Sequence, residues 1–217
     1  SSCTVYGQAD KLPISEDTLL KKAESPYGNT KKIGEQIIED TCKINNNLNA
    51  ISLRYFNPIG AHSSAKIGEL PIGTPQNLVP FVTQTGIGIR EELSIFGKDY
   101  PTPDGTCIRD YIHVVDLAKA HVIAMKRIIL KDNSDNYEVF NLGTGKGSSV
   151  LEVVNAFEEI SGIKLNYIFS KRRAGDIVAA FADTQKANKI LGWKSELSLN
   201  EAMLSAWEWE KKINSNI

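Results

Sequence analysis

The stretch Ser25-Pro26-Tyr27-Gly28-Asn29-Thr30-Lys31 places a tyrosine and a lysine four residues apart. Proline favours the first turn of a helix, so this stretch predicts the start of a helix over residues 25–44. Positions i and i+4 lie on one face of a helix, a single turn apart. The Lys31 ammonium is therefore expected beside the Tyr27 phenol, where its charge favours the ionised form. A phenolate held in this way can remove a proton from a substrate hydroxyl.

A second stretch, Ser1-Ser2-Cys3-Thr4-Val5-Tyr6-Gly7, lies upstream and strengthens this interpretation. A tyrosine–lysine pair alone is weak evidence, because amphipathic surface helices contain it by chance. The chain has no initial Met and starts inside what we interpret as a loop between a strand and a helix. We therefore expect it to be a fragment of a longer protein.

The hydrophobic pattern further along the chain predicts an α/β fold. An apolar stripe on the first helix consists of Ile33, Ile37, Cys42 and Ile44. The expected strands are residues 49–56 and 137–142. The expected later helices are residues 117–130 with Asp116 as the cap, residues 149–161, a short helix between Thr184 and Gly192, and residues 199–213. Residues 61–77 are rich in Gly, Pro and Ser and predict a long loop, a kind of segment that is usually functional or disordered.

Composition and charge argue against several classes of protein. The 217 residues are 41% hydrophobic and 24% charged, as in ordinary globular proteins. The formal net charge of -1 gives no reason to expect a nucleic acid or a membrane surface as a partner. No apolar run approaches the roughly 20 residues of a membrane span, and no signal peptide is visible. Cys3, Cys42 and Cys107 are odd in number and far apart, which favours reduced thiols in the cytoplasm over disulfides or a metal site.

The glycine-rich turn Gly143-Thr144-Gly145-Lys146-Gly147 follows a predicted strand and precedes a predicted helix. Its G-x-G-x-G spacing matches neither the dinucleotide fingerprint nor the phosphate-binding loop. We therefore interpret it as a tight turn, with Ser148 or Ser149 as the cap of the helix.

Two arginines, Arg109 and Arg173, are candidate substrate anchors. Arginine binds phosphate oxygens in a planar fork, so two converging arginines suit a diphosphate. Each is equally well explained as one half of a surface ion pair. Asp176 would accept hydrogen bonds from ribose hydroxyls, or simply cap a turn.

Together, these motifs resemble those of the UDP-glucose 4-epimerases (UDP-galactose 4-epimerases) of the extended short-chain dehydrogenase/reductase superfamily. The resemblance covers essentially the whole chain. Besides the two stretches quoted above, its carriers are Leu53–His62, Asn77–Pro80, Ile95–Tyr100, Arg109–Val114, Asn141–Gly143 and Arg172–Asp176. The tyrosine–lysine pair belongs to the whole superfamily, whereas Asn57–His62 and Arg109–Val114 point to the epimerase branch.

The resemblance implies two parts of a fold. Residues 1–60 would be the C-terminal portion of a Rossmann NAD-binding domain, and residues 61–217 a smaller mixed α/β domain that binds the UDP-sugar. A segment near residues 108–145 would pack back on the Rossmann portion. Family members begin with a further Rossmann half that carries the glycine fingerprint for NAD. We therefore expect residues 1–217 alone neither to hold NAD tightly nor to turn over, and the full-length protein to be a homodimer.

The implied reaction inverts C4 of UDP-glucose and UDP-galactose with bound NAD, through a transient 4-keto sugar. Tyr27 would remove the C4 hydroxyl proton, and Lys31 would bind the nicotinamide ribose. Ser2 would bridge the C4 oxygen and Tyr27, with Thr4 close by. Tyr55 and Phe56 would border the nicotinamide. The implied substrate-binding residues are Asn57, Asn77, Leu78, Phe96 against the uracil, Arg109, Tyr111, Arg173 and Asp176.

Two positions depart from the pattern of the family. Cys3 replaces the usual alanine, a small change that should be tolerated. Ala180 stands four residues after Asp176, where some members carry a bulky residue near the sugar. A small residue leaves room for an N-acetyl group at C2, so we expect UDP-N-acetylhexosamines to be further substrates. The alternative is that Ala180 is a packing residue with no bearing on specificity.

Other interpretations stay open. A nucleotide-sugar 4,6-dehydratase, or another sugar-nucleotide enzyme of the superfamily, would share the fold. A dehydratase normally carries Asp-Glu after the active-site threonine, where this chain has Val5-Tyr6. A non-catalytic sensor of NAD or a nucleotide sugar would not need Ser2, Tyr27 and Lys31 together. An NADH-like rise in absorbance on adding UDP-sugar to the full-length protein would distinguish an enzyme from a sensor.

Overall fold

The computed structural model describes residues 1–173 and 175–215. Its helices are α1 (Pro26–Ile44), α2 (Leu78–Gly86), α3 (Val114–Ile129), α4 (Val150–Ser161) and α5 (Leu199–Asn214), with the short helical turns η1 (Cys3–Tyr6) and η2 (Ala187–Leu191). Its strands are β1 (Ala50–Tyr55), β2 (Asn57–Ile59), β3 (Leu93–Phe96), β4 (Ile108–Arg109), β5 (Tyr111–His113), β6 (Tyr137–Leu142), β7 (Ser148–Ser149), β8 (Tyr167–Ser170) and β9 (Ala179–Ala180). The predicted α/β class is confirmed. No helix in these ranges has the length and apolar character that crossing a membrane needs.

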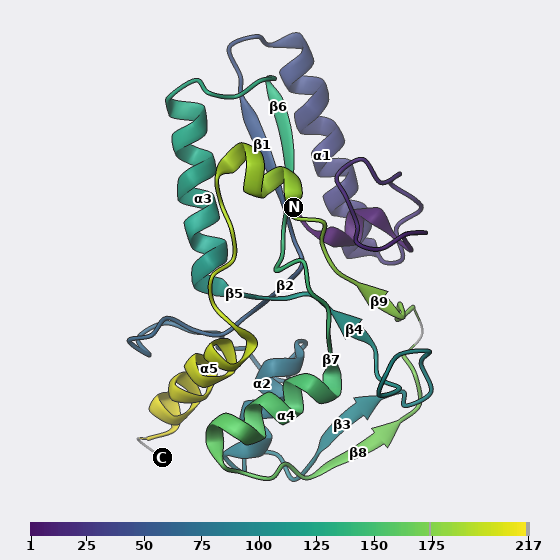
Figure 1. Cartoon of the computed structure of the whole chain (residues 1–217), viewed down its shortest axis with the longest axis vertical. Coiled ribbons are helices and arrows are strands. Elements are labelled where there is room, and N and C mark those ends of the chain that lie inside the picture. Colours follow the sequence, from purple (N-terminus) through teal and green to yellow (C-terminus); the bar gives the residue numbers. More distant parts are fainter. Residues whose placement is uncertain (174, 216–217) are drawn as a thin grey trace.

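One layered unit is built around strands β1 and β6, which pair in parallel with Leu53 opposite Phe140. Helices α1 and α3 lie on either side of this pair (Figure 1). Parallel strands covered on both faces are continuously apolar, and Leu53, Phe140 and Leu142 are buried accordingly. The segment that supplies α3 and β6 therefore packs against β1, although it follows β1 by more than fifty residues along the chain.

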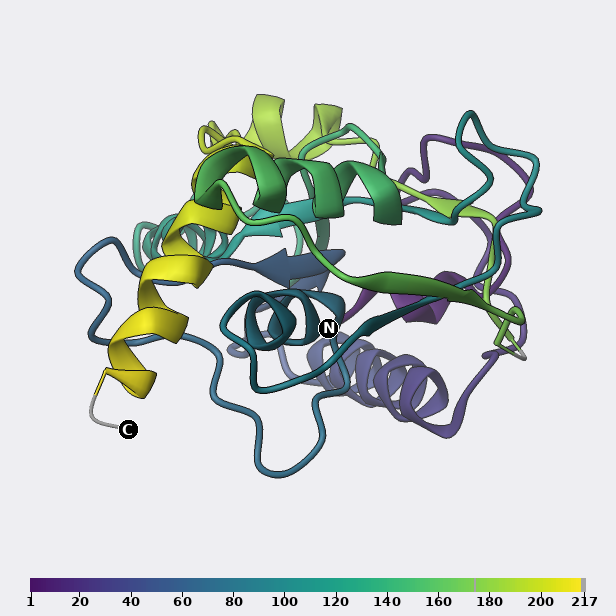
Figure 2. The ribbon, with the colours of Figure 1, turned by 90° about the horizontal axis from the view of Figure 1, so that it is seen from below.

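A second unit contains the parallel pair β3–β8 and the helices α2, α4 and α5. Figure 1 shows these three helices at the lower end of the molecule together with β3 and β8, and Figure 2 shows the molecule from that end. Their shared core includes Ile95, Val153, Phe157 and Trp207, with the rings of Phe157 and Trp207 edge to face at 5.2 Å between centroids. Such pairs add stabilisation beyond the burial of their area.

Short strands join the two units. Strand β2 continues the chain from β1 and pairs in parallel with β5, and β5 leads into α3. Strand β4 pairs with β7 on one side and β9 on the other. The division at residue 60 stays a prediction, but the elements that carry most of the candidate site residues meet at this junction.

The predicted cap of α3 was wrong. The helix begins at Val114, because the Nδ1 atom of His113 accepts a hydrogen bond from the Val115 N–H at 3.0 Å. Asp116 lies inside the first turn, fully buried, where its carboxylate accepts the backbone N–H groups of Glu196 and Leu197 at 2.8 Å each. It ties the helix to the segment before α5.

In the apolar stripe of α1, Cys42 is buried whereas the isoleucines are exposed. Ile33 is 48% exposed and Ile37 is 62% exposed. The buried positions of α1 are Gly28, Glu35 and Cys42, which recur every seven residues on the opposite face. Glu35 is tolerated inside because Arg54 pairs with it.

Candidate active site

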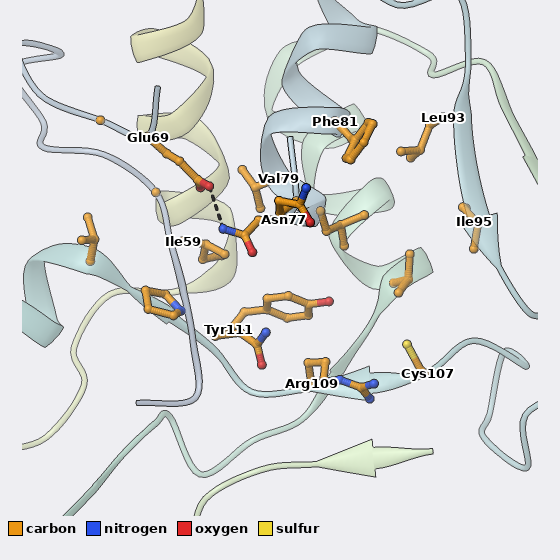
Figure 3. A pocket seen from close by; sticks show the side chains of 18 of the residues that line it. Ile59, Glu69, Asn77, Val79, Phe81, Leu93, Ile95, Cys107, Arg109 and Tyr111 are labelled. Carbon is orange, nitrogen blue, oxygen red and sulfur yellow. Dashed lines mark hydrogen bonds between the residues drawn. The ribbon is translucent and has the colours of Figure 1, made fainter. Parts of the chain in front are cut away.

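A cavity of about 1000 Å³ lies at the junction of the two units, lined from β2, α2, β3, β4 and β5 (Figure 3). Eight of the predicted substrate-binding residues lie in its walls: Asn57, Asn77, Leu78, Phe96, Arg109, Tyr111, Arg173 and Asp176. The structure therefore brings together side chains that are up to 119 positions apart in the sequence. Apolar side chains such as Ile59, Val79 and Leu93 complete the lining.

Arg109 is fixed by the backbone around it. Its Nη1 atom donates to the carbonyl oxygens of Ile108 and Ile177 at 2.8 Å each, and its Nη2 atom lies 3.5 Å from Asp176 Oδ1. Arg109 can therefore be both a substrate anchor and half of an ion pair, because its ion pair with Asp176 lies in the wall of the cavity. A guanidinium held in this way is preorganised for an anion.

Arg173 and Arg172 are neighbours in the sequence but have different surroundings. The Arg173 guanidinium lies over the Phe96 ring, 3.8 Å from its centroid, and both residues line the cavity. The Arg172 guanidinium lies over the Tyr100 ring at 4.1 Å, and its Nε atom donates to Asp99 at 2.8 Å. Arg172 therefore belongs to a surface ion pair, and Arg173 is the candidate anchor for the substrate.

The N-terminus of α2 forms another wall of the cavity through Asn77, Leu78 and Val79. The Asn77 side chain makes no capping bond and instead donates to Glu69 Oε1 at 2.7 Å (Figure 3). Unpaired N–H groups and the helix dipole attract an anion to such an end. Together with Arg109 and Arg173, it favours a negatively charged ligand.

Tyr27 and Lys31 lie at the start of α1, as the spacing predicts. The Lys31 ammonium is 5.3 Å from the centroid of the Tyr27 ring. Ser25 caps the helix by accepting the Gly28 N–H at 3.1 Å. A Cβ atom at Gly28 would lie 3.1 Å from the Thr4 carbonyl oxygen, so glycine lets α1 approach η1 closely.

Ser2 and Thr4 lie on the turn that α1 approaches. The Thr4 hydroxyl donates to Ser2 Oγ at 3.1 Å, and Ser2 forms a parallel bridge to Tyr55 at the end of β1. Burial and the nearby Tyr27 phenol raise the pKa of Tyr55. Tyr55 therefore lies near both Ser2 and Tyr27. The four predicted catalytic residues, Ser2, Thr4, Tyr27 and Lys31, form one group next to the end of β1.

Residues 55–57 connect this group with the cavity. The Tyr55 hydroxyl is hydrogen bonded to His121 Nε2 of α3 at 2.5 Å. Phe56 is buried in a cluster with Val5 and Tyr6, whereas Asn57 lines the cavity. His121 had no distinguishing spacing in the sequence, and its contact with Tyr55 depends on the packing of α3 against β1.

Ala180 does not line the cavity, although it was expected near the sugar. It is 4% exposed, belongs to the cluster of Val5, Tyr6 and Phe56, and lies opposite Arg109 in the β4–β9 register. The expected substrate role of Ala180 stays a prediction. Its side chain is next to the strand that carries Arg109.

Asp110 is a residue that the sequence analysis missed. Its fully buried carboxylate accepts the N–H groups of Thr144 at 2.7 Å, Gly145 at 3.2 Å and Ala182 at 3.0 Å. Burial raises the pKa of Asp110. The glycine-rich turn therefore binds a carboxylate of its own chain, which agrees with its interpretation as a structural turn. The one feature of the sequence that could have pointed to Asp110 is its position between two predicted substrate-binding residues, Arg109 and Tyr111.

Cys107 was also missed as a lining residue. Burial raises the pKa of its thiol, so the thiol is neutral at ordinary pH. In Figure 3 it lies beside Arg109, in the segment that leads to Tyr111. Across the described ranges 1–173 and 175–215, no group of three His, Cys, Asp or Glu side chains is arranged to share a metal ion.

Curated relatives confirm the resemblance to UDP-glucose 4-epimerases. The chain is 50% identical to the UDP-glucose 4-epimerase of Bacillus subtilis over 210 residues, which are 97% of this chain and 61% of that protein. It is 46% identical to the UDP-glucose 4-epimerase of Drosophila melanogaster over 213 residues, 98% of this chain and 60% of the relative. The chain thus spans about 60% of the length of the relatives that it matches.

Solved structures agree. The UDP-glucose 4-epimerase of Stenotrophomonas maltophila, with NAD and formylated UDP-arabinopyranose bound, superposes with a TM-score of 0.95 at 44% identity, covering 100% of this chain and 63% of that one. The enzyme of Bifidobacterium longum, in complex with NAD+ and UDP, gives a TM-score of 0.92 at 46% identity over the same shares. Residues 1–205 match the family model described as GDP-mannose 4,6 dehydratase. Because this match covers most of the chain, the protein belongs to the GDP-mannose 4,6 dehydratase family.

Proposed function

We propose that the protein containing this chain is an NAD-dependent UDP-glucose 4-epimerase that interconverts UDP-glucose and UDP-galactose. One observation carries the proposal. Arg109, Arg173 and the N-terminus of α2 line a cavity that suits a nucleoside diphosphate. Asn57 in its wall follows Tyr55, which bridges to Ser2, and Ser2 bonds to Thr4 where α1 approaches with Tyr27. Relatives with 46–50% identity bear the name of this enzyme, and the similar solved structures hold NAD with UDP or a UDP-sugar.

In this proposal the nucleotide is bound far from the reacting carbon. Arg109 and Arg173 bind the diphosphate, Phe96 lies against the uracil, and Asp176 accepts hydrogen bonds from the ribose. Asn57, Asn77, Leu78 and Tyr111 complete the pocket. Binding energy from the nucleotide leaves the sugar free to turn, which an epimerase needs because both faces of C4 must react.

Tyr27 removes the proton of the C4 hydroxyl, and the Lys31 charge favours the phenolate that does so. Ser2, with Thr4 behind it, holds the C4 oxygen next to Tyr27. When bound, NAD would supply a reversible acceptor for the hydride of the sugar's C4, and Tyr27 would return the proton to the C4 oxygen at the end of the reaction. Lys31, Tyr27, Tyr55 and Phe56 are the residues of this chain that would contact the cofactor.

The residues present fit only part of an NAD site. Strand β1 pairs with β6 along one edge, whereas its other edge carries a single bridge, from Tyr55 to Ser2, within the described residues. A further strand beside β1 in the complete protein would continue this sheet. We therefore propose that residues 1–217 alone neither hold NAD tightly nor epimerise. Turnover by purified residues 1–217 with added NAD would contradict this.

Because the family is named for GDP-mannose 4,6 dehydratase, a nucleotide-sugar 4,6-dehydratase is the alternative function to consider. Val5 and Tyr6 follow Thr4 and are both fully buried in an apolar cluster, so the chain offers no acidic pair after the threonine. A dehydratase uses such an acid to remove water from the sugar. Formation of a 4-keto-6-deoxy sugar from a nucleotide hexose would favour this alternative, whereas the epimerase forms only the C4 isomer.

The exposed face of α1 supports the homodimer. Ile33, Ile37 and Ile38 are 48%, 62% and 40% exposed on a helix whose other face is buried. We propose that this face pairs with its copy in the complete protein, which would be cytoplasmic in keeping with its three free thiols. Ile37→Glu should give a monomer in light scattering, while Ile129→Glu on the exposed face of α3 should stay dimeric. A dimeric Ile37→Glu variant would exclude this interface.

A further inference from the structure

Arg54 of β1 lies in the interior of the protein, where a charged side chain needs an explanation. Arg54 is 5% exposed and its partner Glu35 of α1 is 6% exposed. The Nε and Nη2 atoms of Arg54 donate to the two oxygens of Glu35 at 2.9 and 2.6 Å, and Nη1 donates to the Tyr6 hydroxyl at 2.8 Å. A buried ion pair is weak evidence for stability, because desolvation offsets the attraction.

The position of Glu35 on α1 suggests another role for the pair. Tyr27, Lys31 and Glu35 follow one another at intervals of four residues, so they form one row on the helix. A glutamate one turn from a lysine on the same helix is within reach of an ion pair with it. In the structure both Glu35 oxygens are taken by Arg54, and the Lys31 ammonium lies toward Tyr27, 5.3 Å from the ring centroid.

We propose that Arg54 is a positioning residue of the active site, which keeps Lys31 directed to Tyr27 by occupying Glu35. With Arg54 present, the charges of Arg54, Glu35 and Lys31 leave one net positive charge beside Tyr27. Without Arg54, Glu35 is a buried unpaired carboxylate one turn from Lys31, and it captures the ammonium. The phenolate then loses its electrostatic partner. The rate measurement below rests on the proposed function, whereas the structural measurement does not.

Few other ionisable groups face this row. The α-amino group of Ser1 faces Glu35, Lys31 and Arg54, and burial lowers its pKa. Burial raises the pKa of Tyr6 on η1 to about 12 and that of Tyr137 on β6 to about 12, so both phenols are neutral. Among the described residues, further neighbours are Tyr55 on β1, Glu16 near Tyr6, and Glu39, one turn further on α1, which pairs with Lys43 at 3.0 Å. In a protein that is extended or acetylated at its N-terminus, Ser1 carries no α-amino charge and cannot affect the variants compared below.

The test uses Arg54→Met in the complete protein with NAD bound. The acid limb of the profile of kcat against pH should move up by about 1 unit, because more hydroxide is needed to ionise a phenol that has lost a nearby cation. A crystal structure of the variant should show the Lys31 ammonium within hydrogen-bond distance of Glu35. The double variant Arg54→Met/Glu35→Gln should restore the acid limb of the unmodified protein, because no carboxylate remains to capture Lys31.

A matched control separates positioning from stability. Arg127 and Glu138 form a similar, largely buried bidentate pair between α3 and β6, with both distances 2.8 Å and side-chain exposures of 12% and 8%. Arg127→Met should lower stability without moving the acid limb. An unchanged acid limb in Arg54→Met, with Lys31 still beside Tyr27, would overturn the proposal.

The proposal also stays testable if Arg54→Met does not fold. The double variant, which keeps one net positive charge beside Tyr27, should then keep the acid limb of the unmodified protein, and an upward shift in it would overturn the proposal. Glu35→Gln alone leaves two positive charges there and should move the acid limb down. If the unmodified protein shows no epimerisation at all, the proposed function fails. The position of Lys31 in a crystal structure of Arg54→Met then decides the inference by itself.

Discussion

The Arg173 guanidinium lies 3.8 Å from the centroid of the Phe96 ring, in the wall of the cavity. A cation over an aromatic face is held without using its hydrogen-bond donors. This contact leaves the planar fork of Arg173 available to an anion in the cavity, next to the Phe96 ring. This arrangement makes the pair a sensitive reporter of the proposed nucleotide site.

Replacing Arg173 should weaken nucleotide binding specifically. Arg173→Met should lower the affinity for UDP about tenfold to a hundredfold, since hydrogen bonds to charged groups contribute about 1.5–3 kcal/mol each. Isothermal titration calorimetry with UDP measures this. Arg172→Met is the matched control, because Arg172 pairs with Asp99 and Tyr100 instead of facing the cavity. Equal losses in the two variants would contradict the assignment.

Ala180 should decide whether N-acetylated sugars are used. We expect the complete protein to interconvert UDP-N-acetylglucosamine and its C4 epimer, and Ala180→Tyr to lose this activity roughly tenfold or more relative to UDP-glucose. The physical reason is volume next to the β4 strand that carries Arg109. Competition assays with both sugars measure the ratio, and Ala179→Tyr serves as the neighbouring control. An unchanged ratio in Ala180→Tyr would remove Ala180 from the specificity site.

Asp110 gives a prediction about stability. A Cβ atom at Gly143 would lie 2.3 Å from Asp110 Oδ2, so Gly143→Ala should destabilise the protein by about 1–3 kcal/mol through overpacking. Gly34→Ala on α1 meets nothing within 4 Å and should be stabilising by about 0.5–1 kcal/mol. Urea unfolding measures both free energies. A Gly143→Ala variant as stable as the unmodified protein would show that the turn does not depend on Asp110.

His113 should make stability depend on pH. Burial lowers its pKa from the ordinary value of 6.5, and only the neutral ring can accept the Val115 N–H. The unfolded chain therefore binds more protons than the folded one below about pH 6.5, so the free energy of unfolding falls as the pH drops through this window and levels off below the lowered pKa. His113→Asn keeps a capping acceptor and should show a smaller fall between about pH 7.5 and about pH 5.5. His62→Asn, at an exposed position, should behave like the unmodified protein. A fall of equal size in His113→Asn would contradict this origin.

Local patterns in the sequence were enough to predict the helix that starts at Pro26, the strands β1 and β6, and the turn at Gly143. The resemblance added the cavity residues, which no spacing could bring together because they come from separate strands, a helix and the segment between β8 and β9. The burial of Glu35 and Asp110 was not predictable in the same way. A carboxylate is tolerated inside only if distant donors meet it, here Arg54 from β1 and the N–H groups of Thr144, Gly145 and Ala182. The exposure of Ile33 and Ile37 was also not predictable, since hydrophobicity alone does not distinguish a core face from an interface.

The most direct test of the account follows UDP-galactose by proton NMR in the presence of the complete, NAD-loaded protein. The account predicts conversion to UDP-glucose until the same mixture is reached from either sugar, with no net consumption of NAD, and loss of this conversion in Tyr27→Phe. Unchanged UDP-galactose, a 4-keto-6-deoxy product, or a fully active Tyr27→Phe variant would contradict it.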